Sequence, residues 1–192
     1  MSVNRPARKL SGFTLIEVVV GIVVSAIALT FLSALFFSGS GNSVKPLMQI
    51  RAAEFAQSLM EEILAKPFDE NTPVGGIPAC TVCTAQGDLG FDSGEELSPG
   101  VGDRSLFDDV DDYDYYCNDG SPFDIRDAFG NTLNNFTNYR MSICVVYDGD
   151  FNGVDDSTEG VNNVSAKLIT VTVFPPSSVG GGISFSAYKG NY

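Results

Sequence analysis

The residues with the most specific chemistry in this 192-residue sequence lie in one acidic stretch, DGDFNGVDDSTE, from Asp148 to Glu159. The stretch satisfies D-x-[DN]-x-[DN]-G-x5-E, a pattern in which one loop supplies the oxygen ligands that Ca²⁺ prefers. Gly153, at the sixth position, allows the sharp turn that such a loop makes. The expected ligands are the side chains of Asp148, Asp150, Asn152, Asp156 and Glu159 and the main-chain carbonyl of Val154.

Two departures from this pattern leave a second interpretation open. Strands rather than helices are expected on both sides of the loop, and the eighth position, which is normally apolar, is Asp155. The stretch therefore resembles the calcium loop alone and not the paired helical module. The alternative is a long hairpin loop, rich in Asp, Asn and Gly, that binds no metal. A bound Ca²⁺ would be structural, because it would neutralise carboxylates that otherwise repel one another.

The four cysteines form a second group of reactive residues: Cys80, Cys83, Cys117 and Cys144. In an exported domain an even number of cysteines indicates disulfides, and four allow three connectivities. We favour Cys80 with Cys83 and Cys117 with Cys144. A zinc site would need two close pairs, and a redox-active CxxC would begin a helix after a strand. The CTVC stretch instead follows glycines and a proline, so zinc binding and thiol redox activity are the less favoured alternatives.

Composition excludes several classes of function. The chain has no histidine, which removes the usual general base and the commonest nitrogen ligand of metals. Hydrolytic triads and imidazole metal sites are excluded, and we do not expect an enzyme. Beyond Phe37 the chain has 23 acidic residues and 8 basic ones. This excess of negative charge argues against nucleic acid and anionic lipid headgroups as partners and favours cations or basic surfaces.

An apolar segment, residues 13–37, is expected to anchor this acidic domain. The segment holds one charge, Glu17, and no proline. At about 1.5 Å per helical residue it is long enough to cross a hydrocarbon core of about 30 Å. Three basic residues precede it, namely Arg5, Arg8 and Lys9. Because basic residues beside a spanning helix stay in the cytoplasm, we expect the amino terminus inside and the remaining chain outside.

The residues GFTLIEVVVG at the start of this segment resemble the prepilin leader of type IV pilins and type II secretion pseudopilins. The resemblance implies that residues 1–12 are a leader, cut by a prepilin peptidase between Gly12 and Phe13, and that the new Phe13 amino group is methylated. It also implies that Glu17 pairs with the amino-terminal charge of a neighbouring subunit. A carboxylate near hydrocarbon costs about 2.5 kcal/mol or more unless it is paired, protonated or interfacial. Glu17 would thus set the register of assembly. The alternative is that Glu17 is an acid one turn inside the membrane that has no role in assembly.

The remaining chain predicts an α+β fold of the type IV pilin kind, with a long amino-terminal helix packed on a carboxyl-terminal antiparallel sheet. Residues 38–66 have the pattern of an amphipathic helix, and residues 67–138 that of a loop-rich variable region. Within that region residues 108–119 are dense in aspartate and tyrosine. We interpret them as a solvated acidic loop, with cation binding or partner docking as alternatives. Alternating strands are expected in residues 139–192, on either side of the candidate calcium loop.

Two further stretches narrow the resemblance. RAAEFAQSLMEEILAKPFDE and the ending KLITVTVFPP...ISFSAYKGNY are similar to minor pilins of the mannose-sensitive haemagglutinin (MSHA) pilus, a type IV pilus. This implies a low-abundance subunit that helps to initiate or stabilise the pilus and takes part in adhesion. The absence of a helix-bending proline before Pro46 also fits a minor subunit.

The same resemblance implies partners and a location. The partners would be other pilin subunits, the prepilin peptidase and the inner-membrane assembly platform. The protein would span the inner membrane once, with a periplasmic carboxyl-terminal domain, before it joins a pilus at the cell surface. The alternatives are a minor pseudopilin of type II secretion, a membrane-tethered calcium-dependent adhesin, and a simple membrane anchor that never assembles.

Overall fold

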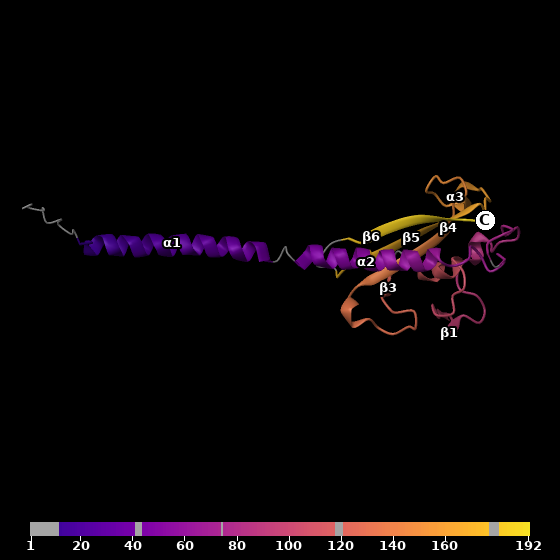
Figure 1. Cartoon of the computed structure of the whole chain (residues 1–192), viewed down its shortest axis with the longest axis horizontal. Coiled ribbons are helices and arrows are strands. Elements are labelled where there is room, and N and C mark those ends of the chain that lie inside the picture. The colour runs from indigo at the N-terminus through magenta and orange to yellow at the C-terminus, as the bar shows by residue number, and fades with distance from the viewer. Residues whose placement is uncertain (1–11, 41–43, 74, 118–120, 177–180) are drawn as a thin grey trace, which may run out of the picture. The chain divides into compact units, whose positions relative to one another are not determined.

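The computed structural model describes residues 12–40, 44–73, 75–117, 121–176 and 181–192. They fall into two compact units, one up to Lys45 and one from Pro46 to Tyr192 (Figure 1). The expected leader, apart from Gly12, lies outside the described residues, and so do the three basic residues within it.

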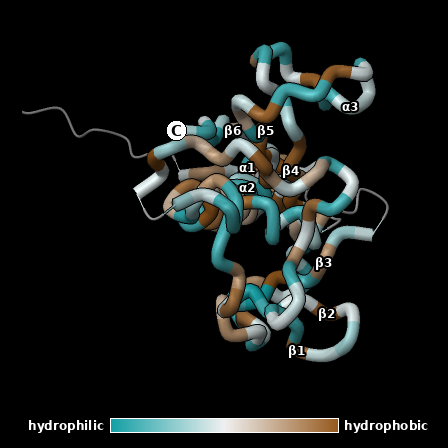
Figure 2. Tube along the Cα trace, turned by 90° about the vertical axis from the view of Figure 1, so that its right-hand side faces the viewer, coloured by the Kyte–Doolittle hydropathy of each residue, from teal (hydrophilic) through white to brown (hydrophobic). Residues whose placement is uncertain are grey.

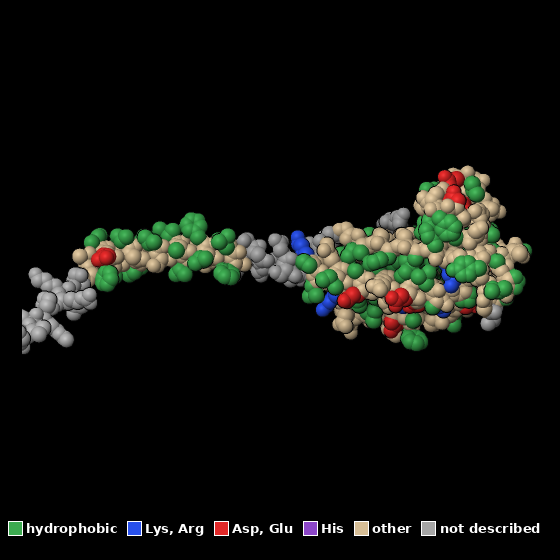
Figure 3. Space-filling view, turned by 45° about the horizontal axis from the view of Figure 1, so that its top comes forward, with side chains coloured by type: hydrophobic (Ala, Val, Ile, Leu, Met, Phe, Trp, Pro, Cys, Tyr) green, Lys and Arg blue, Asp and Glu red, His purple; other side chains and the backbone are tan. Residues whose placement is uncertain are grey.

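The first unit is a single helix, α1 (Leu15–Ser40). Apolar side chains cover the face of α1 that Figure 3 shows, and Leu15–Phe36 is long and apolar enough to cross a membrane. None of this span is buried. Helices that are hydrophobic all round are stable in lipid or inside a larger apolar assembly. The single-span prediction therefore agrees with the structure of α1.

The second unit begins within the amphipathic helix α2 (Val44–Leu64), at Pro46. It ends because Lys66 closes a tight turn onto the carbonyl of Ile63 and Pro67 cannot extend the helix. Its buried face recurs at helical spacing and consists of Ala52, Ala56, Leu59, Met60 and Ile63. The buried face agrees with the amphipathic pattern expected of residues 38–66, although the helix ends two residues before that boundary.

A four-stranded antiparallel sheet packs against α2. Its order is β3 (Phe123–Asp124), β4 (Arg140–Tyr147), β5 (Ala166–Phe174) and β6 (Ile183–Gly190). Three cross-strand pairs lie fully buried on the face toward α2: Met141 with Val173, Ile143 with Val171, and Val145 with Ile169. Each such side chain contributes about 1.5–3 kcal/mol by leaving water. The helix and the sheet thus share one core, which confirms the α+β fold.

The segment between α2 and β4 covers the outer edge of β4. It holds the hairpin β1 (Glu96–Ser98) with β2 (Val101–Gly102) and short 3₁₀ turns, among them η2 (Asp111–Tyr116). The main-chain N–H of Val145 donates to Asp114 Oδ1 at 2.8 Å, and that of Tyr147 donates to Gln86 Oε1 at 2.9 Å. These side chains satisfy edge groups that could otherwise pair with another strand.

The β1–β2 hairpin and the loop between β4 and β5 project from opposite sides of this unit (Figures 1 and 2). The β4–β5 loop carries a single helical turn, α3 (Asp156–Glu159), and strands flank the loop on both sides, as expected. The loop is anchored at its start, because the N–H of Asp148 donates to the carbonyl of Ala166 at 3.1 Å.

Candidate functional site

The amino-terminal end of α1 has a capped first turn. The Thr14 hydroxyl accepts the main-chain N–H of Glu17 at 3.4 Å, and the Thr14 carbonyl accepts the same N–H at 3.1 Å. Thr14 and Glu17 have the spacing of a capping box, and an acid in the first turn interacts favourably with the helix dipole. Phe13 lies exposed just before this turn. Local structure thus explains why an acid is tolerated at this end of the helix.

Capping leaves the charge of Glu17 without a counter-ion. The described ion pairs do not include Glu17, and α1 has no Lys or Arg. Since an unpaired carboxylate is costly in hydrocarbon, a cation from outside α1 is required once this turn leaves water. The nearest candidate in sequence is the amino group that cleavage before Phe13 would create.

The β4–β5 loop from Asp148 to Glu159, hereafter the acidic loop, brings three of its predicted ligands together. Asp148 follows the last residue of β4, and Asp156 opens α3. One carboxylate oxygen from each of Asp148, Asp150 and Asp156 lies within 4.8 Å of the other two. Figure 3 shows acidic side chains gathered on this loop. Asp148 and Asp156 are buried, whereas Asp150 faces solvent.

Asp148 is held by donors from the loop and from the last strand. Its carboxylate accepts main-chain N–H groups from Asn152 at 3.0 Å and Gly153 at 2.7 Å, and the Tyr188 hydroxyl at 2.5 Å. Burial alone would raise the pKa of Asp148, but these donors outweigh it and the pKa lies below its ordinary value. Gly153 has a φ of 84°, a left-handed conformation that glycine adopts without strain.

Asn152 and Glu159 are linked to the group by hydrogen bonds. The Asn152 amide nitrogen donates to Asp150 Oδ2 at 3.1 Å and to Glu159 Oε2 at 2.8 Å. The Asn152 amide oxygen accepts the N–H of Val154 at 2.7 Å. A neutral amide thus bridges two carboxylates. Glu159 lies beside the group of three and is not part of it.

Asp156 is the unusual member of the group. Its Oδ2 accepts the N–H of Gly149 at 2.9 Å, but its buried Oδ1 has no hydrogen-bond partner among the described residues. Burial, and then the side chains of Asp148 and Asp156, raise the pKa of the nearby Asp150, although the Asn152 N–H opposes them. The negative charges of Asp148 and Asp156 thus contribute to the raised pKa of Asp150, and a cation among the three carboxylates would oppose that contribution.

A second acidic group lies around Lys167 and involves the run expected to be a solvated loop. That expectation is wrong, because Asp109, Asp111 and Asp112 are only 2–3% exposed. Lys167, at the start of β5, is fully buried and forms ion pairs with Asp111 and, at 3.5 Å, with Asp69. We call these five residues the Lys167 cluster.

Lys167 is fully satisfied within this cluster. Its Nζ also donates to the carbonyl of Phe68 at 2.7 Å and lies 4.5 Å from the centroid of the Phe68 ring. Burial pushes the pKa of Asp69 up, but N–H groups of Thr84 and Asn71 and the Lys167 charge hold it below its ordinary value. Asp69 and Asp111 therefore both have an internal cation as a partner.

The other two acids of the cluster hold protons instead. Burial, followed by the charges of Asp111 and Asp112, raises the pKa of Asp109 to about 10. Burial, with a side-chain hydrogen bond to Glu95, raises the pKa of Asp112 to about 8, although N–H groups of Asp109 and Asp108 oppose the rise. Both groups are neutral near pH 7. The charges of the cluster are therefore compensated within the fold, and we interpret the cluster as a structural element that supports the sheet.

The cysteines form two disulfides, Cys80–Cys83 and Cys117–Cys144, with Cα atoms 5.6 Å and 4.5 Å apart. No cysteine of the chain is free. Sulfur atoms in disulfides are not thiolate ligands, so the zinc alternative finds no ligand set here. Asn191 joins the first disulfide to the last strand, since it accepts the N–H of Cys80 at 2.9 Å and donates to its carbonyl at 3.0 Å.

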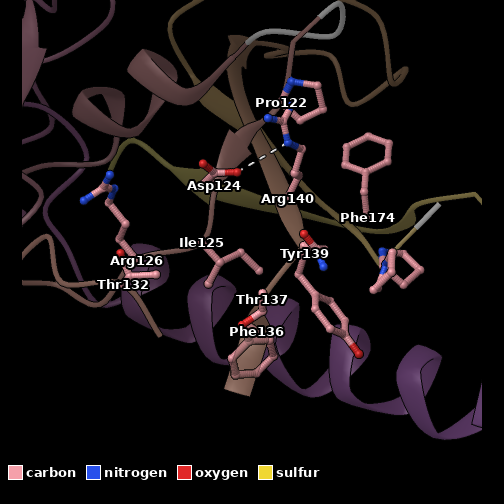
Figure 4. A pocket seen from close by; sticks show the side chains of 13 residues that line it. Pro122, Asp124, Ile125, Arg126, Thr132, Phe136, Thr137, Tyr139, Arg140 and Phe174 are labelled. Carbon is pink, nitrogen blue, oxygen red and sulfur yellow. Dashed lines mark ion pairs between the residues drawn. The ribbon is translucent and has the colours of Figure 1, made fainter. Parts of the chain in front are cut away.

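A cavity of about 930 Å³ lies beside β3 and the start of β4 (Figure 4). Its charged groups are already paired: Arg140 contacts Asp124 at 3.4 Å, and Arg126 donates to the carbonyl of Gly130 at 2.8 Å. The rest of the lining is mainly aromatic, proline and threonine side chains. No set of polar groups converges on a ligand position, so the cavity does not define a catalytic site.

Three residues that organise these groups were not predicted from the sequence. Lys167 and Tyr188 were counted only as strand residues, and Asn191 was not considered. The approach of Lys167 to Asp111 joins positions 56 residues apart, and that of Tyr188 to Asp148 joins positions 40 apart. A lysine inside an otherwise apolar strand pattern was the one signal of a buried counter-charge.

Comparison with known proteins identifies the amino-terminal segment. Residues 7–33 match the prokaryotic N-terminal methylation motif, a match that includes the Gly12–Phe13 junction and Glu17. No curated protein and no solved structure matches the chain. An apolar helix with this motif at its start fits single-pass membrane anchoring and suggests a structural, non-enzymatic subunit. The match supports a type IV pilin-like protein.

Proposed function

We propose that this protein is a minor pilin of an MSHA-type pilus, an assembly subunit that takes part in pilus biogenesis and adhesion. The observation that carries the proposal is the amino-terminal end of α1. Three features coincide there. The methylation motif covers this end of the helix, the first turn is capped and contains Glu17 without a described counter-ion, and the apolar helix is not buried. The apolar helix needs an apolar environment, and the acid needs a cation from outside the helix.

Assembly supplies both. In the membrane, α1 is solvated by lipid; in a filament, α1 packs among the equivalent helices of neighbouring subunits. Glu17 then pairs with the methylated Phe13 amino group of a neighbour, and the register in which this contact forms is the register of the filament. A misplaced subunit leaves Glu17 unpaired in an apolar core, which costs about 2.5 kcal/mol or more. The sheet domain faces outward.

The minor role and the pilus type rest on resemblance. The α2 sequence and the sequences of β5 and β6 are similar to the D-type minor pilin of the MSHA pilus. The α1 sequence has no proline, whereas major pilins carry a helix-bending proline in this segment. We therefore propose a low-abundance subunit whose partners are other pilins, the prepilin peptidase and the inner-membrane assembly platform.

The proposed location follows from topology. The basic residues before Phe13 keep the leader in the cytoplasm, so α1 crosses the inner membrane and the sheet domain lies in the periplasm. Two disulfides in that domain agree with an oxidising compartment. Removal of the leader then frees the subunit to move into a pilus at the cell surface.

The test is a count of surface filaments in the native host, with all other pilus genes intact. We expect Glu17→Gln, which keeps the size of the side chain and removes its charge, to reduce filament number as deletion of the gene does. Thr30→Ala is the matched control, because the Thr30 hydroxyl bonds only to the carbonyl of Ile27 within α1. Normal filament number in both Glu17→Gln and the deletion strain would contradict the proposal.

A minor pseudopilin of type II secretion remains the competing function, since the methylation motif does not distinguish it. The same deletion strain separates the two. Loss of filaments with normal secretion of exported enzymes supports the pilin, whereas loss of secretion with normal filaments supports the pseudopilin.

A further inference from the structure

We propose that the acidic loop is a structural Ca²⁺ site, in which Asp148, Asp150 and Asp156 supply carboxylate oxygens to one ion. This inference goes beyond the assembly function and does not depend on it, because it rests on the geometry of the loop alone. The ion would lie between the end of β4 and the single turn of α3.

The spacing of the three oxygens fits one coordination sphere. They lie within 4.8 Å of one another. Ca²⁺ binds oxygen at about 2.3–2.6 Å, so two ligands on opposite sides of the ion are about 4.6–5.2 Å apart and adjacent ligands are closer. All three carboxylates can therefore contact the same ion without a large movement of the main chain.

Asp156 gives independent evidence for a ligand. It is 1% exposed, and its Oδ1 has no hydrogen-bond partner among the described residues. Buried carboxylate oxygens are almost always hydrogen-bonded or bound to metal, because neither water nor an apolar environment compensates them. The oxygen belongs to a side chain that already converges with two other acids, so a cation is the partner that satisfies it.

No Lys or Arg side chain of the described residues pairs with these carboxylates. Residues 148–159 include no Lys or Arg, and no ion pair among the described residues reaches them. The donors that hold Asp148 are neutral N–H and O–H groups. They shape the loop but leave the negative charge of the group uncompensated.

The ligand chemistry selects Ca²⁺. Every available donor is a hard oxygen, which excludes metals that prefer sulfur or imidazole. Mg²⁺ demands near-ideal octahedral geometry and keeps its waters, whereas Ca²⁺ accepts the irregular set of oxygens that a 12-residue loop of this pattern offers. Asn152 and Glu159 now share a hydrogen bond beside the group. The amide oxygen of Asn152, the carboxylate of Glu159 and the carbonyl of Val154 would complete the sphere.

The ion would order more than the loop. Asp148 also accepts the Tyr188 hydroxyl from β6, and the Phe151 ring lies 4.9 Å from the Tyr188 ring. Binding at Asp148 therefore fixes a loop that is packed on the edge strand of the sheet. Filling this site would stiffen one side of the outward-facing domain.

The experiment uses the full chain in detergent, stripped of divalent cations, and titrates it with Ca²⁺ by calorimetry. A second readout is Tb³⁺ luminescence sensitised by tyrosine, which is informative because the chain has no Trp and Tyr188 contacts the site. We expect one Ca²⁺ per chain with a dissociation constant of about 10⁻⁴–10⁻³ M, as in extracellular modules, and displacement of Tb³⁺ by Ca²⁺ but not by Mg²⁺.

Adjacent residues supply the matched pair of variants. Asp156→Asn removes the buried ligand, whereas Asp155→Asn removes the same charge one position earlier and can still cap the N–H of Ser157. We expect Asp156→Asn to bind at least tenfold more weakly and Asp155→Asn to bind like the wild type. Asp150→Asn, at an exposed position, should also lose binding and excludes misfolding as the cause. Absence of Ca²⁺ binding in the wild type, or equal binding in the Asp156 and Asp155 variants, would overturn the proposal.

Discussion

The Lys167 cluster and the acidic loop both hold several carboxylates at one end of the sheet domain, but in the described part of the chain only the cluster contains a cation. In the cluster, Lys167 contacts Asp69 and Asp111, and the two remaining acids hold protons near pH 7. In the loop, neutral donors hold Asp148, and one oxygen of Asp156 has no described partner. The cluster has its compensating charge within the fold, whereas we propose that the loop takes its compensating charge from an ion in solution.

This difference shows that the density of acids in a sequence does not by itself indicate solvation or metal binding. What separates the two regions is the source of the compensating charge. Glu17 is a third case, since we propose that its counter-charge comes from a neighbouring subunit.

Removing the internal cation should cost the most. Lys167→Met leaves Asp69 and Asp111 buried without a positive partner, and the loss of one partner of a buried pair typically costs about 3–5 kcal/mol. We expect a matching fall in the free energy of unfolding, measured by urea denaturation of the full chain in detergent. Lys189→Met is the control, because Lys189 donates to the carbonyl of Leu64. Equal destabilisation by the two variants would refute a special role for Lys167.

The stability of the domain should fall as the pH rises between 5 and 8. Asp109 and Asp112 have pKa values of about 10 and about 8 in the fold, against an ordinary value of 3.8, so they bind protons in the folded state that the unfolded chain has lost. For each proton that only the folded state binds, the free energy of unfolding falls by about 1.4 kcal/mol for every unit by which the pH rises. Urea denaturation at several pH values measures the slope.

Asp109→Asn isolates one part of that slope. Asparagine mimics the protonated acid and can still accept the N–H of Asp111. We therefore expect the stability of the variant to depend less on pH. Relative to the wild type, the variant should be more stable at pH 8 than it is at pH 5. Asp88→Asn, at an exposed position, should leave the slope unchanged. A variant Asp109→Asn with the same slope as the wild type would mean that Asp109 is ionised in the fold.

Loosening the acidic loop from β6 should have a smaller effect. Tyr188→Phe keeps the ring contact with Phe151 and removes the hydroxyl that Asp148 accepts. We expect a fall in Tm of about 2–4 °C without Ca²⁺, since the loop loses one donor. The Ca²⁺ affinity should persist, because the three carboxylates remain. Loss of Ca²⁺ binding in this variant would place the tyrosine, rather than the carboxylates, at the centre of the site.

The smallest effect should come from Asp150→Asn in the absence of Ca²⁺. Asp150 is exposed and repelled by its neighbours, so the variant should melt within about 2 °C of the wild type. With Ca²⁺ at 10 times the wild-type dissociation constant, about 1.4 kcal/mol of stabilisation is expected for the wild type alone. Thermal unfolding with and without the ion measures both. Equal stabilisation of the variant would remove Asp150 from the ligand set.

Local patterns predicted much of this molecule. The apolar run of α1, the helical spacing of Ala52, Ala56 and Ile63, and the alternation in β4 and β5 each depend on neighbouring residues in the chain. The calcium pattern is also local, which is why the loop could be singled out. The Cys80–Cys83 disulfide could also be predicted from local sequence, because its two cysteines are close together in the chain.

The missed features depend on contacts between distant segments. The burial of Asp109, Asp111 and Asp112 follows from Lys167, which the fold brings from β5, and a single sequence does not show that approach. The Cys117–Cys144 disulfide, which links the end of η2 to β4 over 27 positions, was by contrast among the favoured pairings and is confirmed. Composition alone therefore indicated an exposed loop where the structure has a buried charge network.

The most direct test of the assembly claim is the mass of the protein recovered from filaments sheared off native cells. Our account predicts a chain that begins at Phe13, carries one added methyl group at its amino terminus and is present at low abundance relative to the main subunit. A protein found only in the membrane fraction, or one that still carries residues 1–12, would contradict the account.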